Sequence, residues 1–399
     1  MKKTIYMLLC LLLAAGLTSC QDWFIEKPEV TGMDQDEVFS TAKNAEGAIA
    51  EAYATILSSG LPVLVWNNSP IMPYETTEAI MGGEDLCRLT WGYMDKQVVA
   101  GMLANNENNG AVYTDDYFPN NYAYIRKAWL VYENIDKVAD MSDRDKAIVK
   151  AEMQVLVAFR YVEMLKRYGG VPLVESTLTT VDVRPRSTVQ QTLDFIVGLC
   201  DAAAATLEGV RWPADWLGRV NKGVALAVKA EALMYAARPL FNADAPYMQM
   251  SDPSNNEMIW LGGYDVKRWE TARLANQEVI DWGKANGFEL IDTGDPIKDY
   301  GTAVGTPSNR EVLLAYKQQR EADDNGIYKN YTFMPTHTGH DLGQYRGTGY
   351  GQLCQYRKAD GTDQTWAGVD DWRPAGEYRD KAEELEPRAQ AVSYTHLTL

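Results

Sequence analysis

Histidine is the residue that this sequence has least of, with 3 among 399 residues. Chemistry that relies on histidine for proton transfer or metal binding therefore has few possible sites. The 5 cysteines include no Cys-x-x-Cys pair, which excludes a zinc ribbon and a thioredoxin-like motif. Basic residues are also few, 38 against 55 acidic ones, for a net charge of −17. Because a protein that follows a phosphate backbone needs a basic surface, we expect no nucleic-acid partner.

Sequence motifs of common enzymes are missing as well. The chain has no Gly-x-Ser-x-Gly, no His-Glu-x-x-His and no phosphate-binding loop with Lys-Ser/Thr. Gly347-x-Gly349-x-Gly351 lies in a tyrosine-rich stretch and is typical of a flexible loop. His337-x-x-His340 has no Cys or third His near it, so no metal and no cofactor are predicted.

What the sequence does have is an ordinary globular composition with an unusual choice of aromatics. Apolar residues make up 46% and charged residues 23%, which excludes a disordered, collagenous or multi-span membrane protein. Its 11 Trp and 23 Tyr far outnumber its 8 Phe. Trp and Tyr combine a flat apolar face with a polar group, so they suit hydrated binding surfaces.

The N-terminus predicts where the protein resides. Two lysines precede an apolar stretch of about 13 residues, which is shorter than the roughly 20 that a membrane-spanning helix needs. Leu17-Thr18-Ser19-Cys20 resembles the bacterial lipobox, and an ordinary cleavable signal with a chance cysteine is the alternative. We expect residues 1–19 to be a lipoprotein signal peptide, Cys20 to carry lipid, and residues 20–33 to form a tether. Gln21-Asp22 resembles a surface-export signal, which predicts the outer face of the outer membrane.

Helical periodicity and capping signals dominate the rest of the chain. Capping signals occur at Asp34-x-x-Glu37, Ser142-x-x-Asp145 and Ser187-x-x-Gln190. The predicted helices are 34–57, 122–135, 142–168, 188–207, 222–238 and 267–284, and the best strand signal is 311–316. Residues 58–121, 286–309 and 317–377 are irregular. Helix pairs joined by short turns favour a tetratricopeptide-like array of helical hairpins.

Several segments together resemble the SusD/RagB family of surface glycan-binding lipoproteins. They are Trp129–Asn134, Ala151–Tyr161, the Tyr-Gly-Gly-Val-Pro-Leu turn at 168–173, Gly218–Asn242 and Asn309–Val312. The resemblance implies a mostly α fold with a tetratricopeptide-like scaffold and an irregular, loop-rich ligand domain over 34–390. It also implies a SusC-like TonB-dependent transporter as partner, an oligosaccharide ligand and no catalysis. Residues 391–399 match nothing in the family and are interpreted as a non-native tail, which would leave the domain truncated at its C-terminus.

Segment 58–121 is the predicted ligand segment, because it groups aromatics with hydroxyl-binding residues and lacks periodicity. Its candidate glycan-binding residues are Trp66, Asn67, Tyr74, Asp85, Arg88, Trp91 and Tyr93. Trp91 is the expected stacking platform, with Asp85 and Arg88 binding hydroxyls. The alternative is that its tryptophans are core residues. Trp366 and Trp372 are further candidates, whereas Trp129 and Trp269 lie on helical faces and are predicted to be core.

Three functional classes follow. Non-catalytic glycan capture leads, and a surface glycoside hydrolase on a helical scaffold is the alternative, because 55 acidic residues offer many carboxylate pairs. A two-lobed solute-binding protein ranks last, since it would alternate strands with helices. Glu152 and Arg160 share a helix with core residues and are interpreted as structural ion-pairing groups. Cys200 is predicted to be a small buried hydrophobe.

Overall fold

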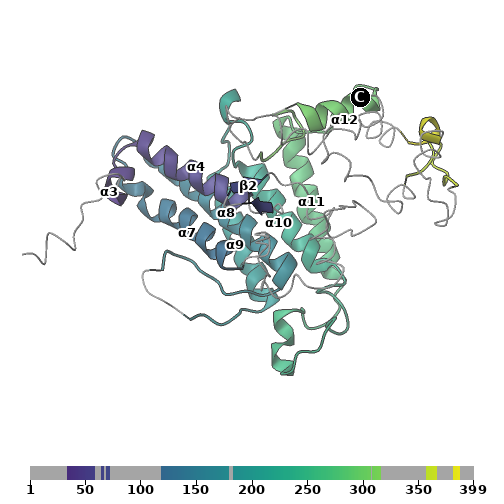
Figure 1. Cartoon of the computed structure of the whole chain (residues 1–399), viewed down its shortest axis with the longest axis horizontal. Helices are drawn as coiled ribbons and strands as arrows, with labels where there is room; N and C mark the ends of the chain where they lie inside the picture. Colours follow the sequence, from purple (N-terminus) through teal and green to yellow (C-terminus); the bar gives the residue numbers. More distant parts are fainter. Residues whose placement is uncertain are drawn as a thin grey trace, which may run out of the picture.

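A computed structural model describes residues 34–58, 64–66, 69–71, 118–178, 183–306, 308–315, 356–365 and 381–386 (Figure 1). Helices dominate these ranges, as predicted. The long ones are α4 (Ala42–Ser58), α7 (Phe118–Asn134), α8 (Asp143–Tyr168), α9 (Val189–Thr206), α10 (Lys222–Ala237) and α11 (Lys267–Asn286). Short helices are α3 (Gln35–Val38), α12 (Pro296–Gly305), η4 (Ile135–Lys137), η5 (Ala214–Trp216), η6 (Pro253–Met258) and η9 (Ala382–Glu384). Strands β1 (Leu64–Trp66) and β2 (Ser69–Ile71) form an antiparallel pair.

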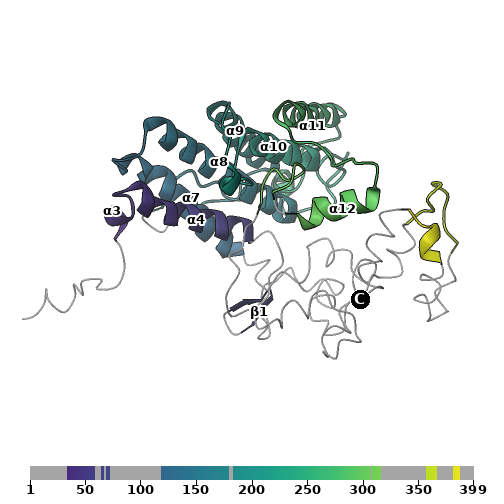
Figure 2. The same cartoon turned by 90° about the horizontal axis from the view of Figure 1, so that it is seen from above.

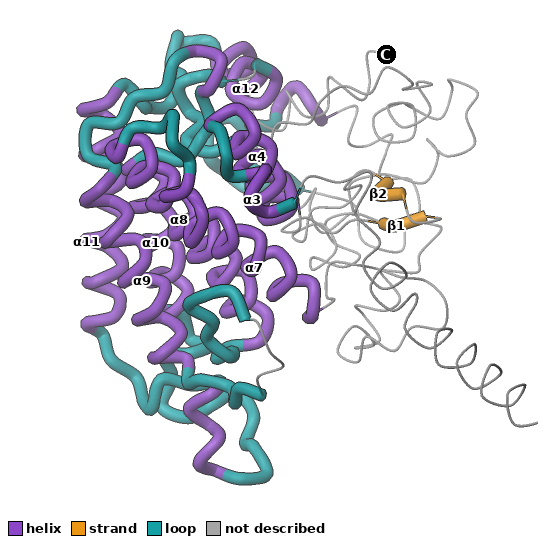
Figure 3. The backbone as a smooth tube through the Cα atoms, turned by 90° about the vertical axis from the view of Figure 1, so that its left-hand side faces the viewer, coloured by secondary structure: helices purple, strands orange, loops and turns teal. Residues whose placement is uncertain are grey.

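The long helices stack in chain order. α4 packs on α7, α7 on α8, α8 on α9, α9 on α10 and α10 on α11, and Figure 2 shows the resulting block. Figure 3 shows α9, α10 and α11 side by side, with the β1–β2 hairpin outside the helical stack. This is the array of helical hairpins that the sequence predicts. Among the described residues, no helix combines the length and the apolar character needed to span a membrane.

The middle of α8 lies at the centre of the stack and is buried on every side. Val155, Leu156, Val157 and Ala158 are consecutive and all fully buried, as expected of a helix that contacts neighbours all round. α8 packs against α4, α7, α9 and α10. Cys200 of α9 is buried in the same core, as predicted.

Small residues let α10 and α11 approach closely. Gly223, Ala225, Ala232 and Ala236 of α10 are buried. A side chain added at Gly223 would overlap the indole ring of Trp282 on α11. The alanine-rich composition of this helix therefore has the close-packing role that its sequence suggests.

Two of the three capping signals work as expected. The Ser142 hydroxyl accepts a hydrogen bond from the Asp145 amide at 3.1 Å, and Asp34 accepts one from the Glu37 amide at 2.7 Å. The third prediction is wrong by one residue: Thr188 and Gln191 form the capping box of α9. The Ser187 amide donates to the Val171 carbonyl at 3.3 Å, so Ser187 belongs to the extended segment and the next hydroxyl caps the helix.

The predicted helix 34–57 is broken into α3 and α4. Phe39 is buried at the break, and the Ser40 hydroxyl donates back to a carbonyl of α3. Thr41 and Asp140 then cap α4: the Thr41 hydroxyl accepts from the Asn44 amide and the Asp140 carboxylate accepts from the Ala42 amide at 2.7 Å. A helix start supplied from residue 140 is a tertiary contact that periodicity does not reveal.

Three other predictions need correction. Residues 311–315 form a turn and bends, not a strand, and the Ala315 amide donates to the Gly218 carbonyl at 2.9 Å. Within the predicted irregular stretch 286–309, Asp295 caps α12 and Pro296 opens it. α7 begins at Phe118, before the predicted 122. Trp129 is buried as predicted, but the prediction that Trp269 is core is wrong, because Trp269 is 38% exposed.

Candidate functional site

The predicted ligand segment connects α4 to α7. Trp66 lies at the end of β1, where its backbone is paired with Ser69 of β2. The other candidates lie outside the described residues: Asn67, Tyr74, Asp85, Arg88, Trp91 and Tyr93. Cys20, His337, His340, Trp366 and Trp372 also lie outside them. Their proposed roles stay predictions.

The helices that carry this segment run antiparallel. Lys137 of η4 pairs with Asp36 at 3.0 Å, and Lys127 pairs with Glu51 at 2.5 Å. The order of these contacts places the end of α4 beside the beginning of α7. The ligand segment therefore leaves the scaffold and returns to it at one end of the same helix pair.

A buried polar cluster lies near this end of α4. The Tyr53 hydroxyl donates to Glu152 Oε1 at 2.5 Å and accepts from the Val220 amide at 3.0 Å. Arg219 Nη2 donates to Glu152 Oε2 at 2.7 Å, and Arg219 Nε donates to Glu152 Oε1. Three chain segments, namely α4, α8 and the loop before α10, thus meet at one carboxylate.

Burial governs the ionisation of this cluster. It raises the pKa of Glu152, and the hydrogen bonds and charge of Arg219 oppose that effect only in part. Burial, reinforced by the neighbouring Glu152 carboxylate, also raises the pKa of Tyr53 well above its ordinary value. For Arg219, burial acts to lower the pKa, but the Glu152 carboxylate outweighs it and the pKa is raised. The negative charge of Glu152 is paired with the positive charge of Arg219 inside the cluster. This arrangement is typical of a structural ion pair and not of a catalytic proton donor.

Arg219 also contacts two aromatic rings. Its guanidinium carbon lies 4.4 Å from the ring centroid of Trp212 and 4.7 Å from that of Trp216. The two indoles stack with centroids 6.5 Å apart and an interplanar angle of 27°. Trp216 is 41% exposed, so the buried ion pair extends through Arg219 to an aromatic surface.

Arg160, the other group on α8 interpreted as structural, has polar and aromatic neighbours of its own. Arg160 Nε donates to Asn121 Oδ1 at 2.5 Å, and its guanidinium lies 5.9 Å from the Tyr124 ring centroid. The ion-pair partner of Glu152 is Arg219, which comes from a loop. The structural role predicted for Glu152 holds, but the pair joins a helix to a loop and not one helix to another.

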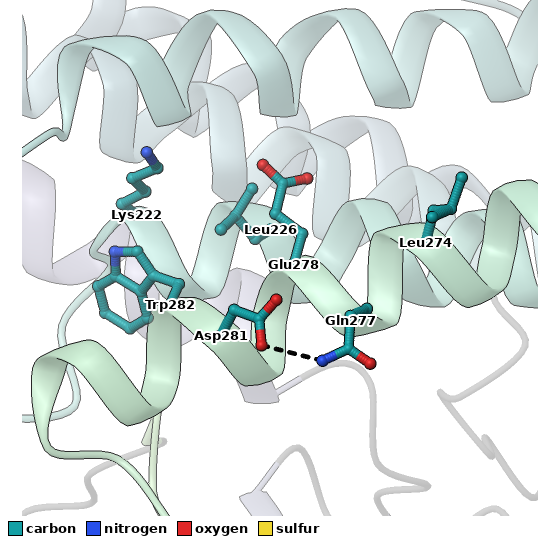
Figure 4. Close-up of a pocket in the computed structure, with 7 residues that line it drawn as sticks. All are labelled: Lys222, Leu226, Leu274, Gln277, Glu278, Asp281 and Trp282. Atoms are coloured by element: carbon teal, nitrogen blue, oxygen red, sulfur yellow. Dashed lines mark hydrogen bonds between the residues drawn. The ribbon is translucent and has the colours of Figure 1, made fainter.

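Two hollows mark the scaffold surface. One, of about 380 Å³, lies between α10 and α11, and Figure 4 shows its lining. The lining residues are Lys222, Leu226, Leu274, Gln277, Glu278, Asp281 and Trp282. Gln277 Nε2 donates to Asp281 one turn along α11 at 2.9 Å, and the hollow combines apolar side chains with charged ones of both signs. The other, of about 350 Å³, lies beside α12 and includes Tyr300 and Glu311.

Metal binding finds no support in this part of the chain. Within the described ranges, no three His, Cys, Asp or Glu side chains gather closely enough to hold a metal ion.

Comparison with known proteins identifies the scaffold. Residues 89–232 match the model of a SusD-like family described as starch-binding and associating with the outer membrane. A SusD-like protein from Bacteroides fragilis superimposes with a TM-score of 0.60 at 20% identity, covering 89% of this chain and 61% of its own. The scaffold has the fold of SusD-like proteins.

A second structure agrees with this assignment. A SusD-like carbohydrate-binding protein from Bacteroides fragilis superimposes on this chain with a TM-score of 0.58 at 18% identity. It covers 89% of this chain and 60% of its own. The chain therefore spans about three-fifths of the length of the two structures. No curated protein matches its sequence.

The cluster around Arg219 is the feature that sequence reasoning missed. Gly218-Arg219-Val220 contributes to the family resemblance, but the residues by themselves suggest no role for Arg219. Trp212-Pro213-x-x-Trp216 lies between two helices, where no helical face demands two tryptophans. That spacing is the signal that could have pointed to an aromatic surface there.

Proposed function

We propose that this protein captures glycans at the cell surface and delivers them, uncleaved, to a SusC-like TonB-dependent outer-membrane transporter. The observation that supports this most is the match of residues 89–232 to a family described as starch-binding and associating with the outer membrane. The matched range includes Trp91 and Tyr93 of the predicted ligand segment. One structure with the same fold is itself named a carbohydrate-binding protein.

Glycan recognition would use the aromatic and polar residues of the ligand segment. Trp91 would stack on the C–H face of a sugar ring, and Asp85 and Arg88 would bind its hydroxyls. Stacking contributes roughly 0.5–1.5 kcal/mol beyond area burial. Since ordering a flexible glycan opposes binding, we expect a Kd on the order of micromolar to millimolar. Weak binding suits a protein that must release its ligand to a transporter.

Calorimetric titration of the full chain tests the proposal. The probes are maltoheptaose and a panel of defined soluble oligosaccharides from xylan, galactan, arabinan and levan. Trp91→Ala should weaken binding of the preferred glycan about tenfold or more without changing Tm. Trp269→Ala, which removes an exposed indole from α11, is the matched control and should bind normally.

Two results would contradict the proposal. If Trp91→Ala unfolds easily while its folded fraction binds normally, Trp91 is a core residue. If chromatography of the incubated glycan shows shortened products, and one carboxylate substitution abolishes them, the protein is a glycoside hydrolase instead.

Location and partner need their own experiments. Cys20→Ala should abolish lipid attachment and release the protein from the membrane fraction. Protease added to intact cells should degrade the wild-type protein if it faces outward, and protection would contradict surface exposure. Co-purification of a SusC-like transporter from solubilised outer membranes would support the partner.

A further inference from the structure

We infer that the indole of Trp216 is a second sugar-stacking platform, on the helical scaffold and separate from the predicted ligand segment. The inference rests on the proposed function, because it adds a contact for the same class of ligand. The ligand is a pyranose ring of a glycan, which would stack on the exposed part of the indole. The contacts around Trp216 carry the argument.

The backbone of Trp216 is held in a tight turn. Trp216 is the last residue of η5, and its amide donates to the Pro213 carbonyl at 2.9 Å. Its own carbonyl accepts from the Arg219 amide at 3.2 Å. The amide and the carbonyl of Trp216 are thus both hydrogen-bonded within the turn, which limits how far the backbone can carry the ring.

Protein groups support the Trp216 ring. Trp212 stacks beside it, and the Arg219 guanidinium packs on both indoles. Trp212 is itself anchored, because its Nε1 donates to the Val220 carbonyl at 2.8 Å. Arg219 is anchored by the fully buried Glu152. Since binding to a preorganised surface avoids the entropy of ordering it, a ring fixed in this way suits ligand stacking.

The indole N–H of Trp216 is available to a ligand. Among the described residues it has no hydrogen-bond partner, and 41% of the residue is exposed. Trp129 and Trp260 differ from it: Nε1 of Trp129 donates to the Val174 carbonyl at 2.9 Å, and Nε1 of Trp260 donates to the Ala243 carbonyl at 2.7 Å. A sugar presents an apolar C–H face next to hydroxyl oxygens, so it can cover the ring and accept from the N–H together.

The platform lies at the end of the scaffold that carries the predicted ligand segment. The loop that holds Trp216 is tied to α4 where the Val220 amide donates to the Tyr53 hydroxyl at 3.0 Å. α4 ends five residues later, at Ser58, where the ligand segment begins. Capture at both places would let one protein hold an oligosaccharide at more than one ring.

Fluorine NMR of the full chain labelled with 5-fluorotryptophan tests this inference. The Trp216 resonance is assigned by its loss in Trp216→Tyr, and the Trp269 resonance by its loss in Trp269→Tyr. The labelled protein is titrated with maltoheptaose and the oligosaccharide panel described above. The glycan that binds by calorimetry should shift the Trp216 resonance and leave that of Trp269, which is 38% exposed, unchanged.

Affinity measurements complete the test. Trp216→Leu, which keeps an apolar side chain over Arg219 but removes the flat ring, should raise the Kd about three- to tenfold. Trp216→Tyr should retain most of the affinity, and Trp269→Leu should behave as wild type. If Trp216→Leu fails to fold, the shift of the Trp216 resonance in the wild-type protein and the affinity of Trp216→Tyr still test whether Trp216 contacts the glycan.

The two proposals fail in different ways. If a glycan binds with measurable heat but neither shifts the Trp216 resonance nor is affected by Trp216→Leu, the platform is overturned and glycan capture stands. If no oligosaccharide of the panel binds, the proposed function is contradicted and the platform falls with it.

Discussion

Arg219 Nη2 lies 2.7 Å from Glu152 Oε2, and the two residues are 67 positions apart in sequence. The Glu152 side chain is fully buried, and that of Arg219 is 13% exposed. The pair joins the central helix α8 to the loop that precedes α10. Because a buried charge needs its partner, this contact makes the position of that loop part of the stability of the core.

Arg219→Met should destabilise the protein strongly. It leaves the Glu152 carboxylate buried without its cation, which costs about 3–5 kcal/mol in comparable pairs. Urea unfolding followed by circular dichroism measures the change in the free energy of unfolding. Arg273→Met is the matched control, because Arg273 and its partner Glu270 are both exposed on α11. Equal stability of the two variants would show that the buried pair contributes no more than a surface one.

Gly170→Ala should destabilise the fold through steric overlap. The added methyl group would collide with the backbone carbonyl of Ser187, at a position where the Gly170 amide donates to the Met258 carbonyl at 2.7 Å. Overpacking of this kind costs typically about 1–3 kcal/mol. Gly198→Ala, on α9 with open space around it, should instead stabilise by about 0.5–1 kcal/mol. Thermal unfolding of both variants measures the two changes in Tm, which should be a decrease for Gly170→Ala and an increase for Gly198→Ala. A lower Tm for Gly198→Ala would contradict this account.

Acid should weaken the protein partly through Glu163. Burial alone would raise its pKa, but Lys166, at 2.6 Å, and Arg167, at 2.7 Å, outweigh that effect and lower the pKa. A carboxyl whose folded-state pKa is depressed stabilises the fold above its unfolded pKa, and this stabilisation is lost as the pH falls through the folded pKa. Between pH 7 and pH 3, Glu163→Gln should therefore lose less stability than the wild type does. Glu46→Gln, at an exposed position on α4, is the control and should follow the wild type. Parallel curves for all three proteins would exclude this role of Glu163.

Cys200 should be unreactive in the folded protein. Burial raises the pKa of its thiol to about 12, with the nearby Asp201 carboxylate adding to the effect. Iodoacetamide at pH 8 should leave the Cys200 peptide unmodified, and the same treatment in urea should modify it, as peptide mass spectrometry will show. Rapid modification under native conditions would mean that this part of α9 opens readily.

Helices with strong local signals were predictable from the sequence. In α8, apolar spacing marks the helix, Ser142 caps its start, and Gly169 with a φ of 73° ends it. Segment 311–315 shows the opposite case. Its apolar run resembles a strand, but a strand needs a partner, and its contact with Gly218 is a single backbone hydrogen bond at Ala315.

The candidate site was predictable only in part. Composition points to the ligand segment, because tryptophans beside Asp and Arg suit a sugar. The platform at Trp216 was not found, since its support comes from Arg219 and, behind it, from a carboxylate on another helix. The sequence around Trp216 does not predict that Glu152 binds Arg219 there.

The sequence by itself determined the helical class, the order of the long helices and most of the faces that they bury. These properties are local, because a residue and its neighbours three and four positions away decide which side of a helix is apolar. Tertiary structure alone decided that Asp140 caps α4, that Thr188 rather than Ser187 caps α9, and that Glu152 pairs with Arg219. Each of these choices depends on a polar group that a distant segment brings within hydrogen-bonding distance. A buried polar group must be paired wherever the chain places it, so its partner is set by packing and not by position in the sequence.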